Sequence, residues 1–292
     1  MGGAAGMIVD CHVNLWDPEH LLERYVRGTA MARHGTIGTV SDMDTVHAAM
    51  EGVDRAIVFS LRYADSAGID GNDEVTARAV AKYPDKFIGF AAVDPRRPDA
   101  MDLLTHAIED MGLKGVKFGP IYNGVSVLDP RMKPVFEYCA RNNLPVTMHM
   151  GTTFAEGTPN RLGRPDDVEE IAQRYPDLKL VMAHLAHPWI EDCVTICRRN
   201  PNVYTEISAI FYRPWQFWNG LICAQEYRIT ERDKIFWGTD FPFATVEESI
   251  EALRNVNHVV EGTGLPRVSE ATIEAILHSN PLEHWWHGGY PG

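Results

Sequence analysis

Short apolar runs alternate with longer amphipathic segments along most of this chain. Eight runs of four to seven residues, several rich in Val, Ile and Phe, have the length and composition of buried strands. The segments between them repeat apolar residues with the helical period of about 3.6. The predicted strands are Met7–His12, Arg55–Ser60, Phe87–Val93, Gly115–Phe118, Pro145–His149, Lys179–His184, Asn202–Ile207 and Lys234–Thr239.

Helical segments separate these strands, and several end at joints that stop a helix, such as Tyr83-Pro84-Asp85. Regular alternation of strands and helices implies right-handed crossovers and a parallel sheet. Eight strands fit a closed (β/α)8 TIM barrel of the α/β class better than an open sheet. The predicted helices are Met43–Glu51, Glu74–Lys82, Ala100–Met111, Met132–Asn142, Asp166–Tyr175, Trp189–Arg199, Trp215–Tyr227, Val246–Val260 and Val268–Ser279.

The chain shows no repeated motif, low-complexity stretch or linker, so we expect residues 1–292 to form a single domain. One segment interrupts the alternation. Residues 15–54, between the first two strands, form an insertion that would lie over the mouth of the barrel, as a lid or as a static packing arm. His34 belongs to this insertion. Near the C-terminus, Trp285 and Trp286 are expected to pack the last helix against the barrel.

Polar residues stand where the predicted strands end, which is where catalytic groups of TIM barrels lie. Asp10-Cys11-His12-Val13-Asn14 closes the first run, and His149, His184 and Asp240 close the fifth, sixth and eighth. A lone histidine at such a position is at least as often a structural group as a ligand. Several of them at different strand ends of one barrel must converge on the same pocket, which favours one catalytic centre.

The order of these motifs resembles the amidohydrolase superfamily, and within it the amidohydrolase-related branch that includes aminocarboxymuconate-semialdehyde decarboxylase. The resemblance covers almost the whole chain, and its most specific part is the segment at the eighth strand. The matching segments are Asp10–Asn14, Gly115–Pro120, the strand-five His149, Ala183-His184-Leu185, Trp237-Gly238-Thr239-Asp240-Phe241-Pro242 and Ile276–Pro281.

The resemblance implies a site with one divalent metal ion, zinc in the first instance and manganese as an alternative. It makes His12, His149 and Asp240 the metal ligands, with Asp240 also the catalytic base, and His184 the catalytic residue that polarises substrate or moves protons. The function expected from it is hydrolysis of a small organic acid, lactone or amide by metal-activated water. Two alternatives are non-oxidative decarboxylation of a cyclic or unsaturated acid, and a binding barrel that has lost its metal.

The sequence departs from the family pattern at Asn14, which stands where a second histidine completes an ordinary His-x-His pair. Asn14 could still replace that histidine as a metal ligand, although an amide oxygen is a weaker ligand than an imidazole. Three outcomes are open. The metal is held by the other three ligands, with Asn14 orienting a ligand or the substrate; His187 supplies the missing nitrogen; or the enzyme works without metal.

Three further residues are candidates for substrate binding. Lys117 lies at the end of the fourth strand, where binuclear relatives carry a carbamylated lysine. We favour a lysine that binds an anionic substrate or pairs with Asp94 or Glu206. Arg62, past the second strand, could hold a carboxylate together with the neighbouring Tyr63. Glu206 on the seventh strand could act as an acid or base, or support a ligating histidine. The aromatic segment Phe211–Trp218 either walls a pocket or packs as a helix start or a dimer contact.

The net charge of the chain limits the kinds of binding partner that we expect. The formal net charge is −13 and the pI about 5.3, which argues against nucleic acid and leaves a small molecule as the expected partner. No apolar run is long enough to span a membrane, and the start of the chain lacks a signal-peptide pattern. The five cysteines are expected to be reduced thiols, so we predict a cytoplasmic protein, for which the resemblance allows a homodimer.

Overall fold

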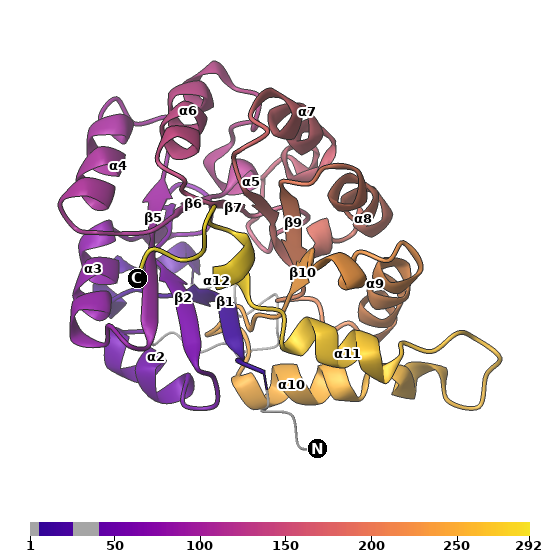
Figure 1. Cartoon of the computed structure of the whole chain (residues 1–292). Helices are drawn as coiled ribbons and strands as arrows, with labels where there is room; N and C mark the ends of the chain where they lie inside the picture. The colour runs from indigo at the N-terminus through magenta and orange to yellow at the C-terminus, as the bar shows by residue number, and fades with distance from the viewer. Residues whose placement is uncertain (1–5, 26–40) are drawn as a thin grey trace.

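The computed structural model of the chain describes residues 6–25 and 41–292 and confirms the predicted (β/α)8 barrel (Figure 1). Its main sheet has eight parallel strands in the order β1-β2-β5-β6-β7-β8-β9-β10. The first and last strands close the ring. The Cys11 amide donates to the Trp237 carbonyl across 3.3 Å, and Val13 pairs in parallel with Phe241 just beyond β10.

The strands lie where the apolar runs predict them, with one informative difference. β1 extends to Asn14, two residues past the predicted end, because its last amide donates to the Phe241 carbonyl over 2.9 Å. His12 and Asn14 therefore both belong to β1, whose pairing with β2 is irregular between Asp10 and Val13. The strands are β1 Val9–Asn14, β2 Arg55–Phe59, β5 Phe87–Val93, β6 Val116–Phe118, β7 Val146–Met148, β8 Leu180–Met182, β9 Val203–Glu206 and β10 Ile235–Phe236.

The helices surround the strands in an outer ring (Figure 1). The predicted helix Val246–Val260 is wrong as one element, because α10 ends at Arg254 and a separate 3-10 turn covers Val256–Val260. A small antiparallel hairpin, β3 Arg62–Tyr63 with β4 Ile69–Asp70, was not predicted. The principal helices are α2 Met43–Ala49, α3 Asp73–Lys82, α4 Ala100–Glu109, α6 Lys133–Arg141, α7 Asp166–Arg174, α8 Ile190–Arg199, α9 Pro214–Glu226, α10 Val246–Arg254 and α11 Glu270–Leu277; α5 Pro120–Asn123 and α12 Pro281–His284 are single turns.

The C-terminal segment closes the end of the barrel at which the strands begin. In Figure 1, α12 lies across the centre of the strand ring. Trp285 is fully buried, and its ring lies 5.3 Å from that of Phe236 on β10. Trp286 donates from its indole nitrogen to the Lys114 carbonyl, just before β6 begins. Both tryptophans thus seal the barrel opposite the carboxyl ends of the strands.

The insertion after β1 has two described parts. Tyr25 is buried, and its ring lies 6.2 Å from Phe154, in the loop after β7 at the carboxyl end of the barrel. From Ser41 onward the chain instead joins the outer layer, where α2 buries Val46 and stacks His47 on Tyr83 at 3.9 Å between ring centroids. Residues 26–40, which include His34 and the Gly/Thr-rich piece, lie outside the described residues.

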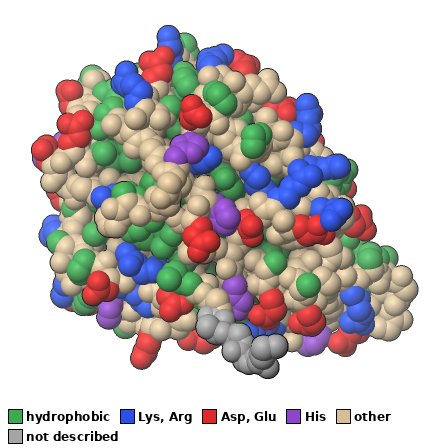
Figure 2. Space-filling model, in the orientation of Figure 1, with side chains coloured by type: hydrophobic (Ala, Val, Ile, Leu, Met, Phe, Trp, Pro, Cys, Tyr) green, Lys and Arg blue, Asp and Glu red, His purple; other side chains and the backbone are tan. Residues whose placement is uncertain are grey.

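All five cysteines are buried and form no disulfide, as the spacing predicts. Within residues 6–25 and 41–292, no helix combines the length and apolar character needed to cross a bilayer. Acidic and basic side chains intermingle over the face of the molecule drawn in Figure 2.

Candidate active site

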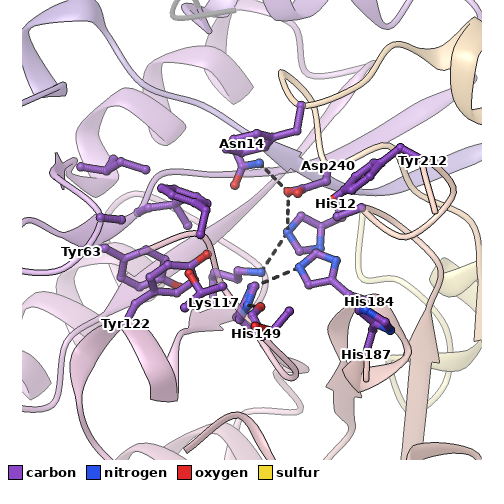
Figure 3. Close-up of a pocket in the computed structure, with 18 of the residues that line it drawn as sticks. His12, Asn14, Tyr63, Lys117, Tyr122, His149, His184, His187, Tyr212 and Asp240 are labelled. Carbon is purple, nitrogen blue, oxygen red and sulfur yellow. Dashed lines mark hydrogen bonds and ion pairs between the residues drawn. The ribbon is translucent and has the colours of Figure 1, made fainter. Parts of the chain in front are cut away.

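A cavity of about 280 Å³ opens at the carboxyl end of the strands, where the strand-end residues were expected to meet (Figure 3). Its floor is polar and its walls are largely aromatic and aliphatic. The lining residues are His12, Asn14, Leu61, Tyr63, Ala67, Ile69, Lys117, Tyr122, His149, Thr152, Thr153, Phe154, His184, His187, Ala209, Tyr212, Arg213, Asp240 and Phe243.

His12 is held in one tautomer by its neighbours. Its Nδ1 lies 2.9 Å from Glu206 Oε1, and its Nε2 lies 3.0 Å from Lys117 Nζ. A carboxylate accepts and an ammonium only donates, so the ring proton sits on Nδ1 and a lone pair on Nε2 faces the cavity. That lone pair is what a metal ion needs, and the Lys117 ammonium competes for it.

Asn14 presents its amide nitrogen to the site. Asn14 Nδ2 donates to Asp240 Oδ1 over 2.8 Å and to the Phe241 carbonyl over 2.9 Å (Figure 3). The flipped amide would set its oxygen against two acceptors, so this orientation is fixed by the surroundings. A nitrogen that carries two protons cannot ligate a metal. Asn14 therefore positions Asp240, and the alternative in which it replaces the missing histidine as a ligand is not supported.

The buried carboxylate of Asp10 connects β1 to the loop that follows β10 through its hydrogen bonds. Asp10 accepts from the His12 amide at 3.0 Å, the Thr239 amide at 3.1 Å and the Thr239 hydroxyl at 2.6 Å. Burial raises the Asp10 pKa to about 7, although these hydrogen bonds act in the opposite direction. Asp10 thereby sets the distance between His12 and Asp240 without touching the cavity.

His149 and His184 face each other with unprotonated nitrogens. His149 Nε2 lies 3.0 Å from the Thr152 carbonyl, and His184 Nδ1 lies 3.0 Å from the Ser208 carbonyl. Carbonyls only accept, so both protons point away from the site. His149 Nδ1 and His184 Nε2 then stand 3.1 Å apart with facing lone pairs, an arrangement that a shared cation stabilises.

These donors suit a divalent cation. One ligand atom each from His12, His184 and Asp240 lies within 4.8 Å of the others, and His12 Nε2 is 3.3 Å from Asp240 Oδ1. Two imidazoles and a carboxylate with an open position are typical of catalytic zinc and manganese sites. The group contains His184 and not the predicted ligand His149, whose Nδ1 lies 3.1 Å from His184 Nε2.

The histidines of the site are neutral. Burial, and then the nearby Lys117 charge, lowers the pKa of His149 to about 3 and that of His12 well below its usual value. Burial likewise dominates the lowered pKa of His184. Lys117 is itself buried, which lowers its pKa to about 8, while the charges of Asp240 and Glu206 oppose that change. Neutral imidazoles are the form that binds metal.

Two sequence-predicted substrate contacts lie outside the cavity lining. Arg62 forms an ion pair with Asp73 at 2.9 Å and donates to the Ala92 carbonyl, so its guanidinium is held away from the cavity. Glu206 is fully buried beneath the site. It holds the His12 ring and accepts from the His184 amide at 3.0 Å, which makes it a support for histidines and not a substrate contact.

Lys117 and His187 do reach the cavity. The Lys117 ammonium lies beside His12 and 4.5 Å from the centroid of the Phe59 ring, not against Asp94. His187 lines the wall but is absent from the metal-competent group found among the described residues, so the alternative in which it supplies the missing nitrogen is not supported.

Apart from Tyr63, which was considered together with Arg62, the aromatic residues of the cavity walls were not singled out as site residues by strand-end reasoning. Tyr63 and Tyr122 stack with their ring centroids 4.5 Å apart, and Phe154 and Phe243 lie 5.9 Å apart. They come from loops after different strands, so no spacing rule brings them together. The cluster of aromatics around Tyr212 was the one available signal, and Tyr212 does line the cavity.

A family model described as amidohydrolase matches residues 9–285. The chain belongs to this amidohydrolase family. This amidohydrolase is 25% identical over 246 residues to a 2-amino-3-carboxymuconate-6-semialdehyde decarboxylase of Dictyostelium discoideum. The match covers 73% of the chain but only 64% of that relative, less than two thirds of its length. The resemblance to the decarboxylase-containing branch is thereby confirmed.

Solved structures share the fold. An uncharacterised TIM-barrel protein of Bordetella bronchiseptica superposes with a TM-score of 0.71 at 20% identity, covering 94% of this chain and 96% of its own. A probable 2-pyrone-4,6-dicarboxylic acid hydrolase of Acinetobacter baumannii gives 0.61 at 16% identity, with coverages of 95% and 98%. A dihydroxybenzoic acid decarboxylase of a Polaromonas species, with bound manganese and 2-nitroresorcinol, gives 0.60 at 16% identity, with coverages of 96% and 97%.

Proposed function

We propose that this amidohydrolase is a metal-dependent, non-oxidative decarboxylase of a cyclic or unsaturated carboxylic acid. The observation that carries the proposal is the pairing of a metal-competent group, His12, His184 and Asp240, with an aromatic-walled cavity, in a chain whose curated relative is named as a decarboxylase. Planar, unsaturated acids suit such walls because flat rings stack on aromatic side chains.

The metal, when bound, would polarise oxygens of the substrate next to the bond that breaks. The neighbouring manganese-bound decarboxylase favours manganese as much as zinc for this role. Lys117, buried on the floor, would hold a carboxylate or hydroxyl oxygen by a charge-assisted hydrogen bond. Loss of CO2 leaves the electron pair of the broken carbon–carbon bond on the substrate. A proton that comes from water must replace the lost carboxyl group on that carbon. His149 Nδ1, which lies beside His184 and belongs to a residue outside the metal-competent group, is the atom proposed to take up this proton and deliver it.

Isotope labelling tests the reaction type directly. Candidate acids, including dihydroxybenzoates and aminocarboxymuconate semialdehyde, would be incubated with manganese-loaded or zinc-loaded enzyme in D2O and, separately, in H2(18)O. A decarboxylase releases CO2 and places one deuterium on the carbon that carried it. We expect Asp240→Asn and His184→Asn to lower this rate by roughly 10²–10⁴-fold. His258→Gln, a change of an exposed histidine, serves as the control.

Hydrolysis of a lactone or amide is the second candidate, because the barrel also resembles that of a probable 2-pyrone-4,6-dicarboxylic acid hydrolase and Asp240 could accept a proton from water. Solvent (18)O in the organic product, without CO2, would establish hydrolysis and refute decarboxylation. Tight binding of acids with no turnover by any metal form would instead favour the binding barrel.

A further inference from the structure

The cavity has a second group of polar side chains, which is separate from the metal-competent group and contains one positive charge, that of Arg213. Arg213 precedes α9 and His187 follows β8, and both line the cavity. Figure 3 places His187 and Tyr212 on one side of the site, with Tyr63 and Tyr122 on the other. The Arg213 charge, after burial, contributes to the lowered pKa of His187, so the two side chains lie within electrostatic reach.

Both groups have unused hydrogen-bonding capacity. The Arg213 guanidinium lies 4.6 Å from the centroid of the Tyr212 ring. Among residues 6–25 and 41–292, no carboxylate forms an ion pair with it, whereas Arg62, Arg96 and Arg164 each have one. His187 Nδ1 is buried with no hydrogen-bond partner in the same part of the chain. A half-buried guanidinium beside an unsatisfied imidazole nitrogen suits an oxyanion, which would form the hydrogen bonds that both groups are missing.

We propose that Arg213 and His187 bind a second anionic group of the substrate, so that the enzyme acts on planar acids with two oxyanions, dicarboxylic acids above all. The inference rests on the proposed function for the identity of the first group, the carboxylate held near Lys117 and lost as CO2. The aromatic side chains that line the same cavity would hold the ring. Arg213 is then a specificity-determining residue, because a monocarboxylic acid leaves its charge unsatisfied.

Binding of simple aromatic acids tests this without turnover. Benzoate and its three dicarboxylate homologues, phthalate, isophthalate and terephthalate, span different separations between two carboxylates. Their dissociation constants would be measured by calorimetry on manganese-loaded enzyme. We expect at least one dicarboxylate to bind roughly 10- to 100-fold more tightly than benzoate, and Arg213→Gln to remove that preference while benzoate affinity stays the same. Arg213→Lys, which keeps the charge but loses the planar donor fork, should retain part of it.

Arg164→Gln is the matched control. Arg164 also lies over an aromatic ring, 5.3 Å from the Trp189 centroid, but it is not among the residues that line the cavity. Its loss should leave the preference unchanged. If no dicarboxylate binds better than benzoate, or if folded Arg213→Gln keeps the preference, the inference is overturned. A dicarboxylate preference in an enzyme that releases no CO2 would support this site while refuting decarboxylation, so the two failures are distinguishable.

Discussion

At the scale of single residues, Asn14 explains how the site departs from a His-x-His pair without losing its metal-competent group. The amide donates to Asp240 and to a backbone carbonyl, so its contribution is to fix the carboxylate. Ligands are oriented by such partners, and mutation of these partners typically costs 10- to 100-fold in metal affinity. The weaker ligand expected from the sequence is thus a positioning group in the structure.

Asn14→Ala should therefore lower the affinity for manganese by roughly 10- to 100-fold, as measured by calorimetry on protein stripped of metal. Asn200→Ala is the matched control. Asn200 Nδ2 also donates to one carboxylate oxygen, of Glu169, and one carbonyl, of Ile196, but far from the cavity. Its replacement should cost stability and leave manganese affinity as it was. Equal metal affinities in wild type and Asn14→Ala would show that Asp240 needs no such support.

Asp10 makes folding stability pH-dependent. Its pKa is about 7 in the folded protein and near 3.8 when exposed, so between pH 4 and 7 the folded chain keeps a proton that the unfolded chain releases. Stability from this group is complete below about pH 4 and falls as pH rises to about 7, by up to about 1.4 kcal/mol per pH unit. Asp10→Asn keeps an acceptor for both backbone amides and removes the titration. Urea unfolding of metal-free protein between pH 4.5 and 8 should give a flatter profile for the variant; parallel profiles would contradict the assignment.

At the scale of elements, the two ends of the barrel have different tasks: the carboxyl ends of the strands carry the site, and the C-terminal segment at the other end serves stability. His184 and Asp240 have φ values of 60° and 61°, in the left-handed region that non-glycine residues seldom adopt. Such strained positions concentrate at functional sites, and here they lie at the ends of the β8 and β10 strands that carry site residues. The opposite end of the barrel is sealed by α12 and the tryptophans that follow it, which serve stability.

Trp285→Ala should destabilise the protein by about 3–5 kcal/mol, the usual cost of removing a large buried aromatic side chain. Trp215→Ala, which changes a side chain that is 52% exposed, should shift stability by less than about 0.5 kcal/mol. Chemical denaturation of both variants gives these values. Because Trp285 is at the far end of the barrel, manganese affinity of the folded variant should match wild type, and a large drop would argue against the division of tasks.

At the scale of the whole molecule, a metal that binds only the folded barrel must stabilise it. His12, His184 and Asp240 come from β1, the turn after β8 and the loop after β10, so the group exists only when the barrel is closed. At a free metal concentration 100 times the dissociation constant, the gain is about 2.7 kcal/mol, or roughly 4–5 °C in melting temperature for a chain of 292 residues.

Manganese or zinc should produce this rise in a thermal melt, and a chelator should reverse it. Asp240→Asn should abolish most of the rise. Asp94→Asn, which changes a carboxylate after β5 at the same end of the barrel that is outside the metal-competent group, should retain it. A melting temperature unaffected by either metal would point to the metal-free alternative, with Lys117 as the resident cation beside His12.

The sequence by itself determined the strand order, the barrel and the convergence of the strand-end histidines and Asp240. Those features follow from local periodicity and from the rule that parallel strands end on the same side of the sheet. His12 needed no knowledge of its neighbours to be recognised, since it stands at a strand end in a motif with Asp10. The same logic placed Glu206 beneath the site, although it could not tell a substrate contact from a support.

Only the tertiary structure decided the rest, because those features depend on contacts between residues far apart in the chain. Arg62 is turned away by Asp73, and Asn14 faces Asp240 with a nitrogen that cannot ligate. Which nitrogen of His149 and of His184 keeps its lone pair depends on the backbone carbonyl to which each ring donates. Hydrogen-bond partners and loop packing have no period along a sequence, so they become visible only when the barrel closes and brings its strand ends together.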